Sequence, residues 1–176
     1  MNERTIRPTG IERTFGEEEI IVSKTDRSGR VTYANDVFLA IAGYTEAEVI
    51  GQPHSLIRHP DMPRGVFKVL WDGLFDKKEV FAYVKNMTRR GDHYWVFAHV
   101  TPTFDANGEI VGFHSNRRTP ERSAIEKVEP LYEVLLAEER KHQSKQDQVA
   151  ASTRLLAKFL AERHTTYDAL VWSLAA

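Results

Sequence analysis

The spacing of hydrophobic positions changes several times along the chain, and each change predicts a different element. Residues 20–22 and 31–33 are rich in β-branched and aromatic side chains, with the turn sequence Asp26-Arg27-Ser28-Gly29 between them. Two such runs around a tight turn predict an antiparallel hairpin.

Two short helices are expected after this hairpin. Asn35 is suited to cap the first helix, whose apolar stripe ends at Gly43. Thr45 and Glu48 have the spacing of a capping box, which predicts the start of the second helix. Three prolines soon afterwards favour single turns over a continuous helix.

A longer helix and three strands make up the next part of the chain. Apolar residues at helical spacing cover residues 66–75, so one helix is expected to lie across the sheet. Three longer runs of β-type residues follow it, joined by two tight turns that contain Asp and Gly. The predicted strands are residues 80–88, 93–104 and 110–116.

Helical spacing returns in the last third of the chain. Residues 125–139 keep this register, with Pro130 as an expected kink or break. A polar bend is expected at 141–148, followed by one last helix over 149–174 with an apolar face. Because that helix lacks clean heptads, packing on the sheet or on a second copy is favoured over a coiled coil.

Composition narrows the classes of function. The chain has 176 residues, which suits one domain with extensions. It carries 24 Lys plus Arg against 25 Asp plus Glu, a formal net charge of -1, so charge does not favour nucleic acid or an anionic membrane. The absence of cysteine excludes disulfides, thiolate nucleophiles and Cys-bound metals. Without an apolar leader or a run of about 18 apolar residues, a cytoplasmic protein with no transmembrane segment is expected.

Catalytic motifs are missing from the sequence. It contains no Gly-rich phosphate loop with its lysine, no His-Glu-x-x-His helix and no nucleophile elbow. We therefore expect a binding or signalling protein and not an enzyme.

Two motifs of uncommon sequence carry a resemblance to a known family. They are Arg58-His59-Pro60-Asp61-Met62-Pro63 and Gly91-Asp92-His93-Tyr94-Trp95-Val96, accompanied by Tyr33-Ala34-Asn35-Asp36 and Val84-Lys85-Asn86. With the element order ββαααβββ, they resemble the PAS domain of bacterial aerotaxis receptors of the Aer type, over about residues 18–135.

The resemblance implies an α+β fold and a division of the chain. The PAS fold is a five-stranded antiparallel sheet with helices on one face, here followed by C-terminal helices. On this basis residues 1–17 are an N-terminal arm, residues 18–119 a PAS sensor domain, and residues 120–176 signalling or packing helices.

The resemblance also implies a bound FAD, with which the first motif is associated in this branch. Arg58 and His59 are then expected to hold the phosphates or ring by charge-assisted bonds, and Asn86 to offer a donor and an acceptor to the edge of the flavin. The complete candidate set is Arg58, His59, Asp61, Asn86, Trp95, Trp71 and His54. Without the resemblance, the same motif suits a solvated loop in which Asp61 caps the following helix and pairs with Arg58.

Two alternatives to FAD stay open. Flavin-binding members of this branch carry a tryptophan at the position of Val80, and neighbouring Phe81 is expected to point to the opposite sheet face. This departure favours a PAS module without a prosthetic group, used for dimerisation or a diffusible ligand. Haem b is the second alternative, because His54 and His59 lie on the helical segments that supply the axial ligand in haem-binding PAS proteins.

The expected function is therefore that of a cytoplasmic sensor of redox state or oxygen. It would act through FAD and signal by binding a chemoreceptor or another chemotaxis component. A homodimer is expected, and nucleic acid is not an expected partner.

Overall fold

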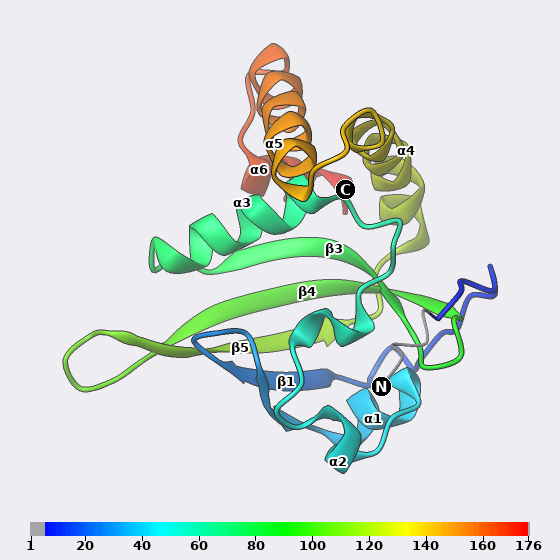
Figure 1. Ribbon diagram of the computed structural model, residues 1–176, viewed down its shortest axis with the longest axis vertical. Coiled ribbons are helices and arrows are strands. Elements are labelled where there is room, and N and C mark those ends of the chain that lie inside the picture. Colours follow the sequence, from blue (N-terminus) through cyan, green and yellow to red (C-terminus); the bar gives the residue numbers. More distant parts are fainter. Residues whose placement is uncertain (1–5, 176) are drawn as a thin grey trace.

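One antiparallel sheet forms the centre of the computed structural model, which describes residues 6–175. Its strands lie in the order β2-β1-β5-β4-β3, so β2 and β3 are the edges (Figure 1). The strand bounds are Ile21–Asp26 for β1, Val31–Ala34 for β2, Val80–Met87 for β3, His93–Phe104 for β4 and Ile110–Arg118 for β5. The predicted α+β fold with a five-stranded antiparallel sheet is confirmed.

The elements between β2 and β3 lie on one face of the sheet, which we call the inner face. They are α1 (Asp36–Ala42), α2 (Glu46–Val49), the 3-10 helix η1 (His54–Ile57) and α3 (Arg64–Phe75). As predicted, Asn35 caps α1 by accepting a hydrogen bond from the Phe38 amide at 3.0 Å. The capping box of Thr45 and Glu48 is also present at the start of α2.

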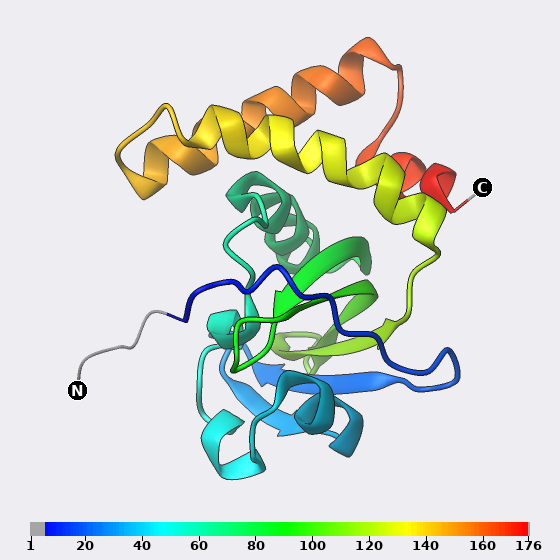
Figure 2. The same cartoon turned by 90° about the vertical axis from the view of Figure 1, so that its right-hand side faces the viewer.

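Three C-terminal helices follow β5, where the sequence predicted two. They are α4 (Arg122–Glu139), α5 (Lys145–Glu162) and α6 (Tyr167–Leu174). The single last helix predicted over 149–174 is wrong, because the chain turns after α5 with His164 at a φ of 49° and Thr166 caps a new helix. Figure 2 shows α4 and α5 crossing above α3.

Of the kink or break expected at Pro130, the break does not occur, because α4 continues through this residue. A proline there leaves the carbonyl of Glu126 without its helical donor. Both residues are exposed, so water can satisfy that carbonyl.

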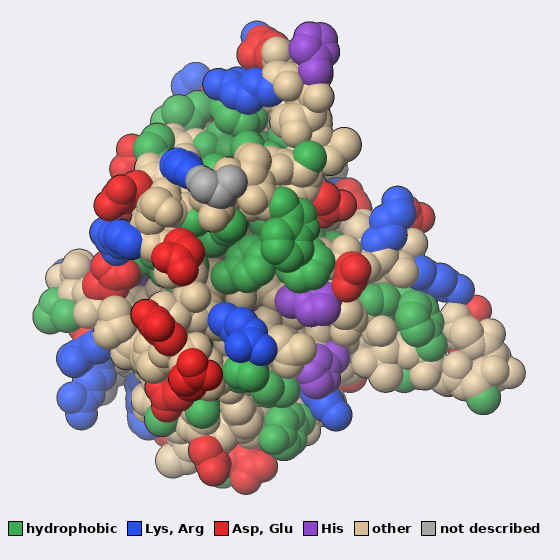
Figure 3. Space-filling view, turned by 180° about the vertical axis from the view of Figure 1, so that it is seen from behind, with side chains coloured by type: hydrophobic (Ala, Val, Ile, Leu, Met, Phe, Trp, Pro, Cys, Tyr) green, Lys and Arg blue, Asp and Glu red, His purple; other side chains and the backbone are tan. Residues whose placement is uncertain are grey.

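The C-terminal helices straddle the edge strand β3. On the outer face of the sheet, the Tyr132 hydroxyl of α4 donates to the Tyr83 carbonyl of β3 at 2.6 Å, and Trp172 of α6 packs on the rings of Phe81 and Phe97. On the other side of β3, α5 packs on α3. Hydrophobic side chains and histidines lie side by side on the back of the molecule (Figure 3). Among residues 6–175, no helix has the length and hydropathy needed to cross a bilayer.

The described part of the N-terminal arm lies along the turn between β3 and β4. Glu12 forms a parallel bridge with His93, and the Thr9 amide donates to the Gly91 carbonyl at 2.9 Å. Both Thr9 and Arg13 donate through their side chains to Asp92, each at 2.6 Å. The arm is thus fixed by several contacts to the turn.

Candidate functional site

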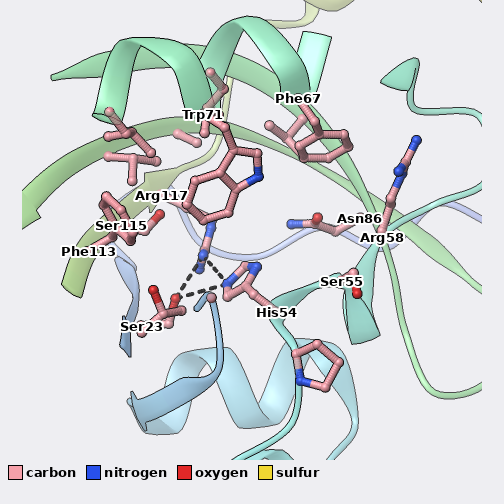
Figure 4. Close-up of a pocket in the computed structure, with 18 of the residues that line it drawn as sticks. Ser23, His54, Ser55, Arg58, Phe67, Trp71, Asn86, Phe113, Ser115 and Arg117 are labelled. Carbon is pink, nitrogen blue, oxygen red and sulfur yellow. Dashed lines mark hydrogen bonds between the residues drawn. The ribbon is translucent and has the colours of Figure 1, made fainter. Parts of the chain in front are cut away.

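A cavity of about 360 Å³ lies between α3 and the inner face of the sheet (Figure 4). This volume falls within the range of small-molecule sites. Its walls are mainly apolar, with polar side chains gathered at the floor and at one end. The apolar wall residues include Phe67, Leu70, Trp71, Leu74, Val84 and Phe113.

Arg117, on β5, forms the floor of this cavity. Its Nη2 donates to the Ser23 hydroxyl at 2.8 Å and lies 2.6 Å from Nε2 of His54. The residue is 4% exposed, and no carboxylate within the described chain pairs with it. Burial lowers the pKa of Arg117 to about 10, so the guanidinium stays charged at neutral pH. The cavity therefore has an unneutralised positive charge at its floor.

His54 stays neutral beside this charge. Burial, and then repulsion by Arg117, lower the pKa of His54 to about 3. A neutral imidazole can accept through Nε2, so Arg117 donates to it, and the proton of the ring is on Nδ1. The short contact therefore orients the imidazole at the cavity wall.

Two buried donors at the cavity have no protein partner of good hydrogen-bond geometry among residues 6–175: Nδ2 of Asn86 and Nη1 of Arg117. The Asn86 amide does interact with the nearby Tyr94 hydroxyl, which partly offsets the rise that burial causes in the pKa of Tyr94. Buried polar groups are normally hydrogen-bonded, and leaving one unpaired costs about 1–3 kcal/mol. The two donors therefore suit a ligand that presents acceptors to both.

The first sequence motif is divided between the two sides of β3. Arg58 forms a bridge with Asn86 at the edge of the strand and lines the cavity, with its guanidinium 4.7 Å from the centre of the Phe67 ring. His59 lies 5.8 Å from the ring of His93, which is on the outer face. The chain runs alongside an edge strand here, so successive side chains point to opposite faces.

Asp61 also lies away from the cavity. Its carboxylate is 3.9 Å from Lys85 on the outer face, and its amide donates to Nδ1 of His59 at 3.1 Å. It does not cap α3 either, so the loop interpretation of the motif is wrong on that point. Glu139 of α4 accepts from the first amides of α3 instead.

The two candidate tryptophans lie on opposite sides of the sheet. Trp71 of α3 points into the cavity and packs edge-on against Phe113, with ring centres 5.1 Å apart (Figure 4). Trp95 faces the other way, because its position on β4 pairs with Lys85, and its ring stacks near Tyr132. Four of the seven predicted residues therefore meet at the cavity: His54, Arg58, Trp71 and Asn86.

Val80 occupies the position at which a tryptophan was expected from the family resemblance, and the structure shows how this position is packed. As expected, Phe81 faces outward, where its ring stacks on His99 at 4.3 Å. Val80 faces inward against α3, where a Cβ on Gly73 would lie only 2.8 Å from it. Close packing thus fills that position, and Trp71 provides an aromatic ring to the cavity from the helix above.

Sequence reasoning missed Arg117, Ser23 and Ser115. Their signal was the alternation of the strands, because Phe113, Ser115 and Arg117 occupy every second position of β5 and all line the cavity. An arginine at an inward-facing position of a strand is uncommon, so this alternation could have marked Arg117 as a candidate.

The histidines do not favour a haem ligand. His54 alone lines the cavity among the histidines of residues 6–175, and its Nε2 accepts from Arg117. His59 lies outside the cavity with His93, and His99 pairs with Glu79 on the outer face. Haem would therefore require His54 to release its present partner.

Comparison with known proteins identifies the class. The family model described as the PAS fold matches residues 31–117. The solved PAS domain from Colwellia psychrerythraea aligns with a TM-score of 0.53 at 18% identity, covering 57% of this chain and 85% of that one. The dark structure of the blue-light photoreceptor Aureochrome1 LOV also gives 0.53 at 19% identity, over 68% and 84% of the two chains. Residues 31–117 of the chain therefore form a domain of the PAS family.

Its PAS domain is of the aerotaxis-receptor type. The aerotaxis receptor of Escherichia coli K12 is 40% identical over 123 residues, which cover 70% of this chain and 24% of the receptor. The nitrogen fixation regulatory protein of Klebsiella pneumoniae is 26% identical over 102 residues, covering 58% of this chain and 21% of that protein. The chain thus matches about a quarter or less of the length of these relatives.

Proposed function

We propose that this protein is a cytoplasmic redox or oxygen sensor that binds FAD in the cavity between α3 and the sheet. The observation that carries the proposal is the pair of unpartnered buried donors, Nδ2 of Asn86 and Nη1 of Arg117. A flavin ring is planar and apolar on its faces, with acceptors along one edge. The apolar walls and these donors fit such a ring.

The remainder of an FAD molecule would extend beyond the flavin ring along the cavity wall. Arg58 lines the cavity, and burial lowers its pKa to about 10, so its guanidinium is charged at neutral pH. A guanidinium can hold a phosphate through two parallel hydrogen bonds. Arg58 is therefore the residue proposed to meet the pyrophosphate.

Bound flavin would supply reversible redox chemistry, with a change of charge on its ring. The residues of this chain that would respond are those that face it. Asn86 can donate or accept as its amide turns, and Arg117 can move its donors between the ligand, Ser23 and His54. Because these side chains belong to β3 and β5, a change in their bonds reaches the sheet on which α4 and α6 pack.

We propose that the protein forms a homodimer. Its output would be the binding of a chemoreceptor or another chemotaxis component. The similarity to the aerotaxis receptor supports this part of the proposal. We propose no catalytic activity for the chain.

An absorption spectrum of the purified 176-residue chain tests this function. The expected result is a flavin spectrum, with FAD released on denaturation. Asn86→Ala should lower the cofactor content, whereas Asn116→Ala, on the outer face beside His114, should not. A colourless protein that also fails to take up added FAD would refute the proposal, and a sharp Soret band would indicate haem.

A further inference from the structure

Helix α3 has no N-terminal cap from its own neighbourhood in the chain. Its capping position is Pro63, whose side chain makes no hydrogen bond. The carboxylate of Glu139, the last residue of α4, instead accepts from the Arg64 amide at 2.5 Å and from the Gly65 amide at 3.3 Å. Glu139 is only 5% exposed. An acidic group from a distant part of the sequence thus satisfies the first amides of α3, as a capping side chain normally would.

Two further contacts hold α3 against the C-terminal helices. Nε of Arg64 donates to Oε1 of Gln148 on α5 at 2.9 Å. Gly65 packs so closely on α5 that an added Cβ would lie 2.4 Å from the Ser152 hydroxyl and 2.8 Å from the Thr153 amide nitrogen. The first turn of α3 is therefore fixed from both α4 and α5.

This first turn lies next to the cavity. The Arg58 guanidinium donates to the Met62 carbonyl at 2.7 Å, immediately before α3 begins. The negative charge of Glu139 also raises the pKa of Arg58, although burial lowers it more. One turn further on, Phe67 lines the cavity, followed by Trp71. Any shift of the α3 N-terminus would therefore move residues that line the site.

We propose that Glu139 is a positioning residue for the cavity, and that its contact with α3 couples docking of the C-terminal helices to ligand binding. The proposal rests on the proposed function for the identity of the ligand, FAD. Coupling of this kind is reciprocal, so bound FAD would stabilise the docked helices by the same factor by which docking strengthens FAD binding.

Glu139→Ala in the full chain tests the coupling, with FAD as the probe. Loss of the buried carboxylate should weaken FAD binding about tenfold, within the usual range for coupled sites. Glu138→Ala is the matched control, because Glu138 is the neighbouring residue and pairs with Lys141 at the surface. It should leave the dissociation constant unchanged. Equal binding by wild type and Glu139→Ala would overturn the proposal.

Gly65→Ala disturbs the docking of the first turn of α3 at its contact with α5. Alanine is the better helix former by about 1 kcal/mol, so α3 alone would be strengthened. The clash with Ser152 should nevertheless weaken FAD binding as Glu139→Ala does. If Gly65→Ala and Glu139→Ala both act by undocking the C-terminal helices from α3, the double variant should bind FAD no more weakly than either single variant. Fully additive losses would contradict a shared mechanism.

Amide hydrogen exchange separates this proposal from the identity of the ligand. In the wild type, FAD should slow exchange at the Arg64 and Gly65 amides, whereas a purely structural cap would protect them equally with and without FAD. If the wild type binds no FAD, the proposed function fails, but the positioning role is still decided on the free protein. In that case, Glu139→Ala must speed amide hydrogen exchange along α3 as far as Phe67 and Trp71, which line the cavity. An effect confined to Arg64 and Gly65 would overturn it.

Discussion

Nη2 of Arg117 lies 2.6 Å from Nε2 of His54, so the buried charge at the cavity floor has a neutral imidazole as its neighbour. The imidazole accepts and stays neutral, so it does not cancel or add to the charge of the guanidinium. A buried charge without an opposite partner is costly unless something compensates for it. The arrangement therefore favours a ligand with negative charge or strong acceptors near Arg117.

The first prediction concerns stability at low pH. The pKa of His54 is lowered to about 3 in the folded chain, against about 6.5 when unfolded. The unfolded state thus binds the proton more readily, and stability falls as the pH drops below about 6.5. His54 alone should lower the free energy of unfolding by about 2 kcal/mol at pH 5 relative to pH 8. Urea unfolding at the two pH values measures this.

His54→Gln provides the control for that measurement. A glutamine oxygen can still accept from Arg117 but does not titrate. The variant should therefore lose less stability between pH 8 and pH 5 than the wild type. Some pH dependence should remain, because burial also lowers the pKa of His59, to about 4. An unchanged pH dependence in His54→Gln would show that His54 is not the group responsible.

The second prediction separates folding from binding at Arg117. Replacing a buried charge with an apolar side chain of similar length is often close to neutral for stability. Arg117→Met should therefore change the free energy of unfolding of the FAD-free protein by no more than about 1 kcal/mol. FAD affinity should fall at least tenfold, since the donor aimed at the ligand is gone. Equal affinity, measured by calorimetry, would remove Arg117 from the proposed site.

Most of the fold could be predicted from local sequence. The strands alternate regularly, and Asn35, Thr45 and Gly43 carry cap signals that act over three or four residues, so their effect does not depend on distant parts of the chain. The division of the last helix was missed although Thr166 is a suitable cap. Helical periodicity continues on both sides of the turn and concealed it.

The site was predictable only in part, for a geometric reason. The prediction treated Arg58, His59 and Asp61 as one cluster. They follow the edge of β3, where alternate side chains point to opposite faces, and only Arg58 reaches the cavity. Contacts such as that of Glu139 with Gly65 join residues 74 positions apart, and no local pattern signals them.

The third prediction concerns the docking of α4 on the sheet. The buried Tyr132 hydroxyl donates to the Tyr83 carbonyl of the edge strand at 2.6 Å. Tyr132→Phe keeps the ring beside Trp95 but leaves that carbonyl unpaired, so the free energy of unfolding should fall by about 1–3 kcal/mol. Tyr33→Phe, at an exposed position of β2, is the control and should have little effect. Equal urea midpoints for the two variants would contradict the prediction.

The last prediction concerns the N-terminal arm. Gly91 and Gly108 both adopt positive φ in hairpin turns, at 94° and 76°. A Cβ on Gly108 would meet nothing within 4 Å, whereas a Cβ on Gly91 would lie 2.1 Å from the Arg7 carbonyl oxygen of the arm. Gly108→Ala should therefore show only the backbone cost of an L-residue at positive φ, about 1–2 kcal/mol. Gly91→Ala should show that cost and also displace the arm.

Limited trypsin digestion distinguishes these two effects. Arg13 is held in the native protein by the Asp92 carboxylate next to Gly91. In Gly91→Ala, displacement of the arm should expose the bond after Arg13, and cleavage there should be faster than in the wild type. Gly108→Ala has the same type of backbone strain but lies in the other turn, so its cleavage at Arg13 should be unchanged. Equal acceleration in both variants would mean that general destabilisation, and not the contact with the arm, controls cleavage.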